Sequence, residues 1–219
     1  MAESMTQQQK IALETISSGT ATEAIGGAAA IVLTILGLSN IAPVYMLSIA
    51  TIAVGVGLLF QGSAIAAEYS DLISKVGGEE LHSMNLGGGL SIEITAGGIG
   101  IGLGILSLVF VVPQILTPIA GIVLGCGIAL SSRTISRLND LKIMTSDAND
   151  TAQKIAREAV NAASGAQVIV GLGAITLGIL SLTGVSPMIL TMIALLSLGF
   201  STLLSGLSTS GKALSSFAR

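Results

Sequence analysis

The sequence predicts an all-α integral membrane protein, with six short transmembrane helices arranged as three parallel-repeat helical hairpins and with amphipathic cytoplasmic helices between them. Composition is the first reason. Of the 219 residues, 51% are hydrophobic and only 10% are charged, and the mean hydropathy is +0.88. Soluble domains usually carry about a quarter of their residues as Asp, Glu, Lys or Arg. A chain so poor in charge is typical of a protein that lives in a lipid bilayer.

Three long apolar blocks are the second reason. They cover roughly 24–61, 94–130 and 168–205, and each is about twice the ~17–20 residues that one membrane-spanning helix needs. Proline lies near the middle of each block, where it interrupts a helix and favours a turn. We therefore predict a helical hairpin in each block, with its turn at the prolines Pro43, Pro113, Pro118 and Pro187.

The distribution of charge predicts the orientation. All nine basic residues fall in the termini or in the two long connectors, and the three hairpin tips carry no charge. Because Lys and Arg are retained on the cytoplasmic side, both termini and both connectors are expected in the cytoplasm. The predicted organisation is an N-terminal amphipathic segment 1–22, hairpin 1 at 23–62, a cytoplasmic connector 63–92, hairpin 2 at 93–131, a helical cytoplasmic connector 132–166, hairpin 3 at 167–206 and a C-terminal tail 207–219.

The three blocks align without gaps. Pro113 follows Pro43 by 70 residues (113 − 43), and Pro187 follows Pro113 by 74 (187 − 113). These offsets superimpose matching residues in all three blocks: Ala50, Ala120 and Ala194; Gly27, Gly97 and Gly171; Gly55, Gly125 and Gly199. A three-fold internal repeat follows. Because every copy begins and ends on the same side, the repeats are parallel, with a pseudo-symmetry axis along the membrane normal.

Glycine lies inside the apolar stretches, as it does where membrane helices pack closely. Four glycines at 98–104 alternate with larger residues, and those four apart define two small-residue faces of one helix. The glycines predicted to pack helices together are Gly27, Gly97, Gly98, Gly100, Gly102, Gly104, Gly121, Gly125 and Gly171.

The repeat also aligns three polar residues at the start of the first helix of each hairpin, namely Glu23, Glu93 and Gln167. Around a pseudo-three-fold axis they would form an acidic collar of the kind that attracts cations to a pore mouth. Alternatively, these residues only stabilise the start of each helix. A carboxylate in the first turn is stabilised by the helix dipole by about 0.3–1 kcal/mol.

Nothing in the sequence favours catalysis. No nucleophile, base and orienting partner can be brought together, so we predict no enzyme and no cofactor. One histidine and one cysteine exclude most metal sites and any disulfide framework, and the net charge of −3 excludes a nucleic-acid binder. The expected partners are the lipid bilayer and further copies of the chain.

Two copies of the repeat share the same short motifs. The first copy has Ile35-Leu36-Gly37-Leu38, Pro43 and Ile49-Ala50, and the second has Ile105-Leu106-Ser107-Leu108, Pro113 and Ile119-Ala120. This pattern resembles the HdeD-like family of bacterial membrane proteins. The resemblance implies six helices built from short hairpin repeats, a bacterial cytoplasmic or intracytoplasmic membrane, and a stress-related role linked to acid resistance. It implies no catalytic or binding residues.

Three functions remain open at this stage. The leading hypothesis is a non-enzymatic scaffold or membrane-shaping protein that self-associates through its small-residue faces. The alternatives are a passive channel or small-solute carrier with the acidic collar as its mouth, and an accessory subunit of a larger membrane complex.

Overall fold

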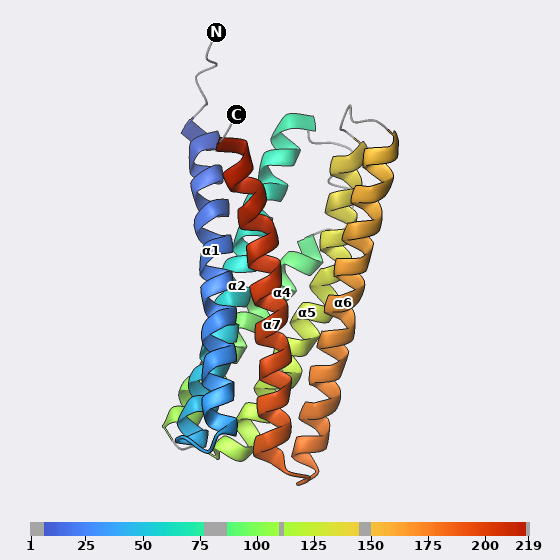
Figure 1. Cartoon of the computed structure of the whole chain (residues 1–219). Coiled ribbons are helices and arrows are strands. Elements are labelled where there is room, and N and C mark those ends of the chain that lie inside the picture. Colours follow the sequence, from blue (N-terminus) through green and yellow to red (C-terminus); the bar gives the residue numbers. More distant parts are fainter. Residues whose placement is uncertain (1–6, 77–86, 110–111, 145–149, 218–219) are drawn as a thin grey trace.

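The computed structural model describes residues 7–76, 87–109, 112–144 and 150–217, and it describes side chains at 21–66, 92–109, 112–132 and 164–207. Across these ranges the chain forms six α-helices and no strand (Figure 1). The helices are α1 (Gln7–Leu38), α2 (Pro43–Val76), α4 (Gly87–Leu108), α5 (Pro113–Met144), α6 (Asp150–Leu182) and α7 (Pro187–Phe217).

The helices form a closed ring. Helices α2, α5 and α7 contact one another and make an inner set. Each of the other three packs against two of these: α1 against α7 and α2, α4 against α2 and α5, and α6 against α5 and α7. The first helix of the chain therefore contacts the last.

Three short turns lie at one end of the ring, opposite the two chain termini (Figure 1). Pro43, Pro113 and Pro187 are the first residues of α2, α5 and α7, where proline lacks only an amide that would be unpaired anyway. The residues before them, Ala42, Val112 and Ser186, have φ values of 40°, 46° and 40°. Positive φ is uncommon for residues other than glycine, so the same costly conformation occurs at the same place in all three turns.

The prediction for Pro118 was wrong, because this proline lies inside α5 and not in a turn. It is near the start of the helix, so the missing amide removes one hydrogen bond, the one that would reach the carbonyl of Gln114. The Pro118 carbonyl oxygen is 3.0 Å from where a Cβ on Gly178 would lie, so it forms part of the close contact between α5 and α6.

Glycine pairs hold the ring together. A Cβ on Gly97 would lie 2.7 Å from the Gly55 carbonyl oxygen, which brings α2 and α4 into backbone contact. A Cβ on Gly171 would likewise lie 2.6 Å from the Gly125 carbonyl oxygen, and a Cβ on Gly27 would lie 2.6 Å from the Gly199 carbonyl oxygen. These six glycines are the aligned positions of the repeat, and they mark the contacts α2–α4, α5–α6 and α7–α1 in turn.

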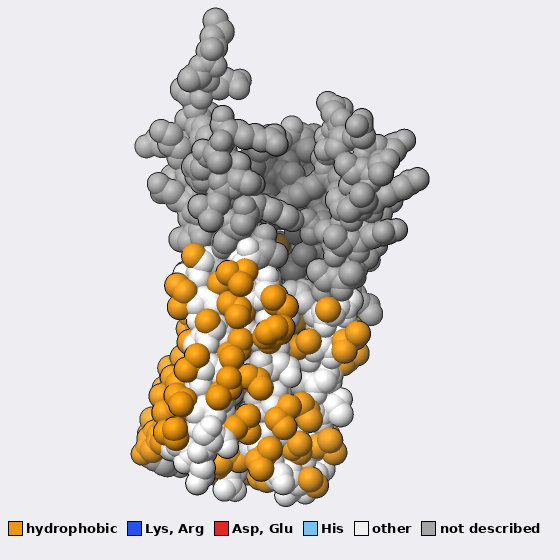
Figure 2. All heavy atoms as spheres, viewed as in Figure 1, with side chains coloured by type: hydrophobic (Ala, Val, Ile, Leu, Met, Phe, Trp, Pro, Cys, Tyr) orange, Lys and Arg blue, Asp and Glu red, His pale blue; other side chains and the backbone are white. Residues whose placement is uncertain are grey.

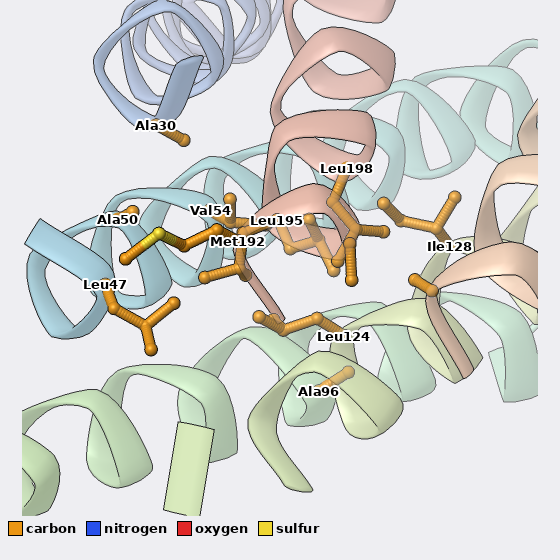
Figure 3. Close-up of a cluster of buried hydrophobic side chains, with 13 residues drawn as sticks. Ala30, Leu47, Ala50, Val54, Ala96, Leu124, Ile128, Met192, Leu195 and Leu198 are labelled. Atoms are coloured by element: carbon orange, nitrogen blue, oxygen red, sulfur yellow. The ribbon is translucent and has the colours of Figure 1, made fainter. Parts of the chain in front are cut away.

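The centre of the ring is filled by apolar side chains. Most come from the three inner helices, as Figure 3 shows, and include Leu47, Val54, Leu58, Leu124, Ile128, Met192, Leu195 and Leu198. Several of them are completely buried. The three inner helices therefore pack around a core of side chains over this length.

The outside is also apolar. Isoleucines such as Ile25 and Ile169 are 69% and 72% exposed, and the face in Figure 2 shows hydrophobic and uncharged atoms wherever side chains are coloured. Five described segments are long and apolar enough to cross a membrane: Ala21–Leu38, Pro43–Ala66, Pro113–Ser132, Ser164–Leu182 and Pro187–Leu207. The apolar part of α4, Ile92–Leu108, is slightly shorter. This pattern indicates an integral membrane protein.

The helices continue beyond the predicted limits of the membrane segments. They have 22 to 34 residues, and the expected boundaries after residues 22, 62, 92, 131, 166 and 206 fall inside continuous helices. No proline lies at these boundaries to end a helix. The predicted amphipathic faces of the N-terminal segment and of the connector helices lie outside the described side chains.

Gly171 and Gly173 on α6 provide a test of the glycine contacts. A Cβ on Gly171 would meet the Gly125 oxygen at 2.6 Å and the Ala129 Cβ at 2.8 Å, whereas a Cβ on Gly173 would meet nothing within 4 Å. Gly171→Ala is expected to lower the free energy of unfolding by about 1–3 kcal/mol, because α5 and α6 must separate. Gly173→Ala is expected to raise it by roughly 0.5–1 kcal/mol. Thermal unfolding in detergent, followed by circular dichroism, measures both, and equal stability of the two variants would contradict the close contact.

Candidate functional site

Two carboxyl groups are the only charged side chains in the part of the chain whose side chains are described. They belong to Glu23 on α1 and Glu93 on α4, and each residue is 1% exposed. A buried carboxyl group is unfavourable unless charge or hydrogen bonds compensate it. Their surroundings are therefore the first place to look for a function.

Glu23 lies close to α2 and reaches α7. Its backbone oxygen is 3.6 Å from where a Cβ on Gly57 would lie, an ordinary van der Waals distance between α1 and α2. The Glu23 carboxyl group is hydrogen-bonded to Ser205 on α7. Gln61 on α2 donates from Nε2 to the same serine oxygen over 3.0 Å. Ser205 therefore links Glu23 to Gln61.

Glu93 makes the corresponding contact between α4 and α5. The Ser131 hydroxyl donates to Glu93 Oε1 over 3.0 Å, and both residues are buried. The Cβ of Glu93 lies beside α2, 3.5 Å from the position of a Cβ on Gly62, the residue that follows Gln61. Glu93 also lies close enough to Glu23 for the two charges to interact.

We call Glu23, Gln61, Glu93, Ser131 and Ser205 the polar layer. They come from five different helices and lie near the same end of the apolar spans. Glu23 is the third residue of Ala21–Leu38, and Ser131 and Ser205 are the second- and third-last residues of their spans. The layer therefore lies at the end of the ring that faces the termini, away from the three turns.

Three buried oxygen atoms of the polar layer have no hydrogen-bond partner. They are Glu23 Oε1, Gln61 Oε1 and Glu93 Oε2, and all three are acceptors. The side chains described for this protein include no Lys, Arg or His that could pair with them. Unpaired polar atoms of this kind cost about 1–3 kcal/mol each, and more when the group is charged.

The structure changes the interpretation of the predicted collar. Glu23 and Glu93 do come together, but they are enclosed among helices and not exposed around an open mouth. Gln167, the third aligned residue, is only half-buried. It belongs to α6, whose span is the least buried of the five, at 22%. The pseudo-symmetry is therefore broken at the third position.

Sequence analysis missed Gln61, Ser131 and Ser205. The signal was present in the repeat, because these residues differ by the same offsets of 70 and 74 that align the prolines. Gln61, Ser131 and Ser205 lie on α2, α5 and α7. Glu23 and the two residues aligned with it lie on α1, α4 and α6, near the same end of the apolar spans. Hydroxyl and amide side chains are common in helices, so the alignment was needed to single out these three.

The chemistry of the layer is that of oxygen ligands. It contains two carboxylates, one amide and two hydroxyls. Among the described residues, no three His, Cys, Asp or Glu side chains are placed to hold a metal ion together. An arrangement of this kind can bind a cation or a proton.

The predicted packing glycines of α4 divide into two groups. A Cβ on Gly100 would lie 2.6 Å from Leu124, and one on Gly104 would lie 2.6 Å from Ile52, so these two glycines face the interior. Gly98 and Gly102 are exposed, and a Cβ on either would meet nothing within 4 Å. Gly121 is buried but likewise has no neighbour within that distance. One small-residue face of α4 is therefore used inside the ring, and the other faces outward.

No protein-family model matches the chain, and comparisons with curated proteins and with solved structures found no significant match.

Adjacent serines on α5 test the energetics of the polar layer. The Ser131 hydroxyl is shared between Glu93 Oε1 at 3.0 Å and the Ile128 carbonyl of its own helix at 3.2 Å. The hydroxyl of Ser132 donates to the Ala129 carbonyl of its own helix. Ser131→Ala is expected to lower the free energy of unfolding by about 1–3 kcal/mol, because it leaves the Glu93 carboxyl group without this partner. Ser132→Ala is expected to change it by less than about 0.5 kcal/mol. Thermal unfolding of both variants measures the difference. An equal decrease in the free energy of unfolding would show that the Ser131–Glu93 hydrogen bond adds no stability beyond that of an intrahelical serine bond.

Proposed function

We propose that this chain is a non-enzymatic membrane scaffold, built from three parallel-repeat hairpins, that associates with copies of itself in the bilayer. The repeat part of the proposal is supported by three equivalent turns and by three equivalent glycine pairs. Both termini lie at the end of the ring opposite the turns (Figure 1), as the predicted cytoplasmic position of both requires. Kinship with the HdeD-like family, and the stress-related role that it implies, belong to the same proposal and rest on the sequence motifs alone.

The observation that carries self-association is the outward face of α4. Gly98 and Gly102 are one helical turn apart and exposed, in a segment that is otherwise rich in isoleucine and leucine. In a membrane, small residues four apart let two helices approach closely and gain van der Waals contacts that lipid does not provide. The other two glycines of this stretch, Gly100 and Gly104, already make such contacts inside the ring. A second copy of α4 is the simplest partner for the outward pair.

The filled core favours this function over a passive channel. A conducting path along the pseudo-symmetry axis would have to pass between the inner helices, where Val54, Leu124, Leu195 and Leu198 are completely buried. The two glutamates that would form the mouth are enclosed as well. A membrane-shaping role is a variant of the scaffold proposal, because both depend on association between copies.

An accessory subunit of a larger complex is the second candidate, since the same glycine face would suit a helix of another protein. The two differ in one respect. A self-associating scaffold forms oligomers when the purified chain is alone in a bilayer, whereas an accessory subunit stays monomeric until its partner is added.

Gly102→Leu tests the outward face. The substitution is expected to fit the monomer, because Gly102 is exposed and nothing lies within 4 Å of a Cβ placed there, but it would hold two copies of α4 apart. It is expected to weaken self-association by about tenfold, corresponding to about 1.4 kcal/mol. Mass photometry of the protein in nanodiscs, or cross-linking in native membranes, measures the fraction of oligomer.

Gly173→Leu is the matched control, because Gly173 is also open to the outside but lies on α6. It should leave the oligomer intact. Gly100→Leu should instead destabilise the fold itself, since its Cβ would lie 2.6 Å from Leu124. A parent protein that is monomeric at all concentrations, or a Gly102→Leu variant that assembles as well as the parent, would refute self-association through this face.

A further inference from the structure

The polar layer has a property that self-association does not explain. Its three unpaired atoms are all buried acceptors, on Glu23, Gln61 and Glu93, and these residues are 1%, 4% and 1% exposed. In the interior of a membrane protein an unsatisfied polar group costs several kcal/mol, because no water or lipid can pair with it. Three such groups at one level of the ring indicate that a ligand is needed there.

The contacts place the three groups around one another. Gln61 and Glu23 are both hydrogen-bonded to Ser205, and the Glu23 and Glu93 charges interact. Glu93 is also beside Gly62, next to Gln61 in the chain. The two carboxylates repel each other when both are ionised, and the described side chains of the surrounding helices contribute no positive group to offset this.

We propose that the polar layer binds one alkali metal cation between Glu23, Gln61 and Glu93. Carboxylate and amide oxygens are the hard ligands that such ions prefer. A single ion can contact more than two oxygens at once, whereas a single proton placed on one of the unpaired oxygens pairs it with only one other. Both serine hydroxyls already hold a carboxylate in place, which leaves the opposite oxygen of each carboxylate for the ion.

The cost of dehydration argues against a divalent ion, which holds its water more tightly than an alkali ion does. Ca²⁺ takes six to eight oxygen ligands, and Mg²⁺ keeps several of its waters. The layer offers three unpaired oxygens in a setting that is almost closed to solvent. Its position near the end of the apolar spans brings it close to the aqueous boundary, so the ion has only a short distance to travel from water.

Thermal stability of the purified full-length chain in nanodiscs tests the proposal. The unfolding temperature is measured by circular dichroism in NaCl, KCl and choline chloride at equal ionic strength, and Na⁺ binding is measured independently by calorimetry. A cation at about 100 times its Kd should raise the unfolding temperature by roughly 5–10 °C relative to choline. The calorimetric titration should saturate at one ion per chain.

Variants locate the effect. Glu23→Gln and Glu93→Gln keep the shape of the side chain and remove the charge, so each should abolish the difference between Na⁺ and choline. In choline each should be more stable than the parent, because the repulsion between the two carboxylates is gone. Ser63→Ala is the control, because the Ser63 hydroxyl lies near the same level of α2 but is exposed and donates to the Phe60 carbonyl of its own helix. It should respond to Na⁺ as the parent does.

Three results would overturn the proposal. The first is equal stability of the parent in alkali chloride and in choline chloride. The second is a stabilisation by Ca²⁺ or Mg²⁺ that Na⁺ and K⁺ do not produce. The third is a dependence on pH alone, unaffected by Na⁺ or K⁺, which would show that protons occupy the layer. None of these results depends on whether the chain self-associates.

Discussion

Direct contact between helix backbones is the constraint on which the rest of this structure depends. At three places the carbonyl oxygen of one glycine occupies the space that a side chain on the facing glycine would need. Bilayer lipid is as apolar as leucine, so helices in a membrane gain little from burying apolar surface against each other and must gain from close packing instead. The pairs Gly55–Gly97, Gly125–Gly171 and Gly199–Gly27 supply such packing between α2 and α4, between α5 and α6, and between α7 and α1. The last of them joins the two ends of the chain and closes the ring.

The closed ring exposes apolar side chains and encloses charged ones. This distribution is the reverse of that in a soluble protein and is typical of a membrane protein. Large aliphatic side chains cover the outside and fill the core. The two charged residues whose side chains are described, Glu23 and Glu93, are enclosed in the polar layer. The inner helices supply Gln61, Ser131 and Ser205 at this level, and the outer helices α1 and α4 supply the glutamates. Because α6 contributes a half-buried Gln167 in place of a third buried carboxylate, the layer is asymmetric within a nearly symmetric ring.

Much of this could be predicted from the sequence, and the failures have physical causes. Proline spacing identified the three turns, and the repeat aligned the six glycines that the structure brings into contact, because both depend on backbone geometry. Pro118 was misplaced because a proline near the start of a helix loses only one hydrogen bond and so does not end it. The helices run past the predicted limits of the membrane segments because a helix that leaves the membrane changes in composition without stopping. Which glycines of α4 face outward, and how deeply the glutamates are enclosed, depends on the neighbours of each helix, and a single sequence does not reveal those.

A disulfide between α1 and α7 would test ring closure most directly. The Ala30 Cβ lies 3.0 Å from where a Cβ on Gly199 would be, slightly less than the 3.5–4.5 Å that a disulfide spans. Ala30→Cys and Gly199→Cys would be introduced with Cys126→Ser, the only native cysteine, and oxidised in native membranes. A closed ring predicts a cross-link within one chain, seen as a monomer with altered electrophoretic mobility that reverts on reduction. No cross-link, or a product of dimer size alone, would show that the first and last helices of one chain do not meet.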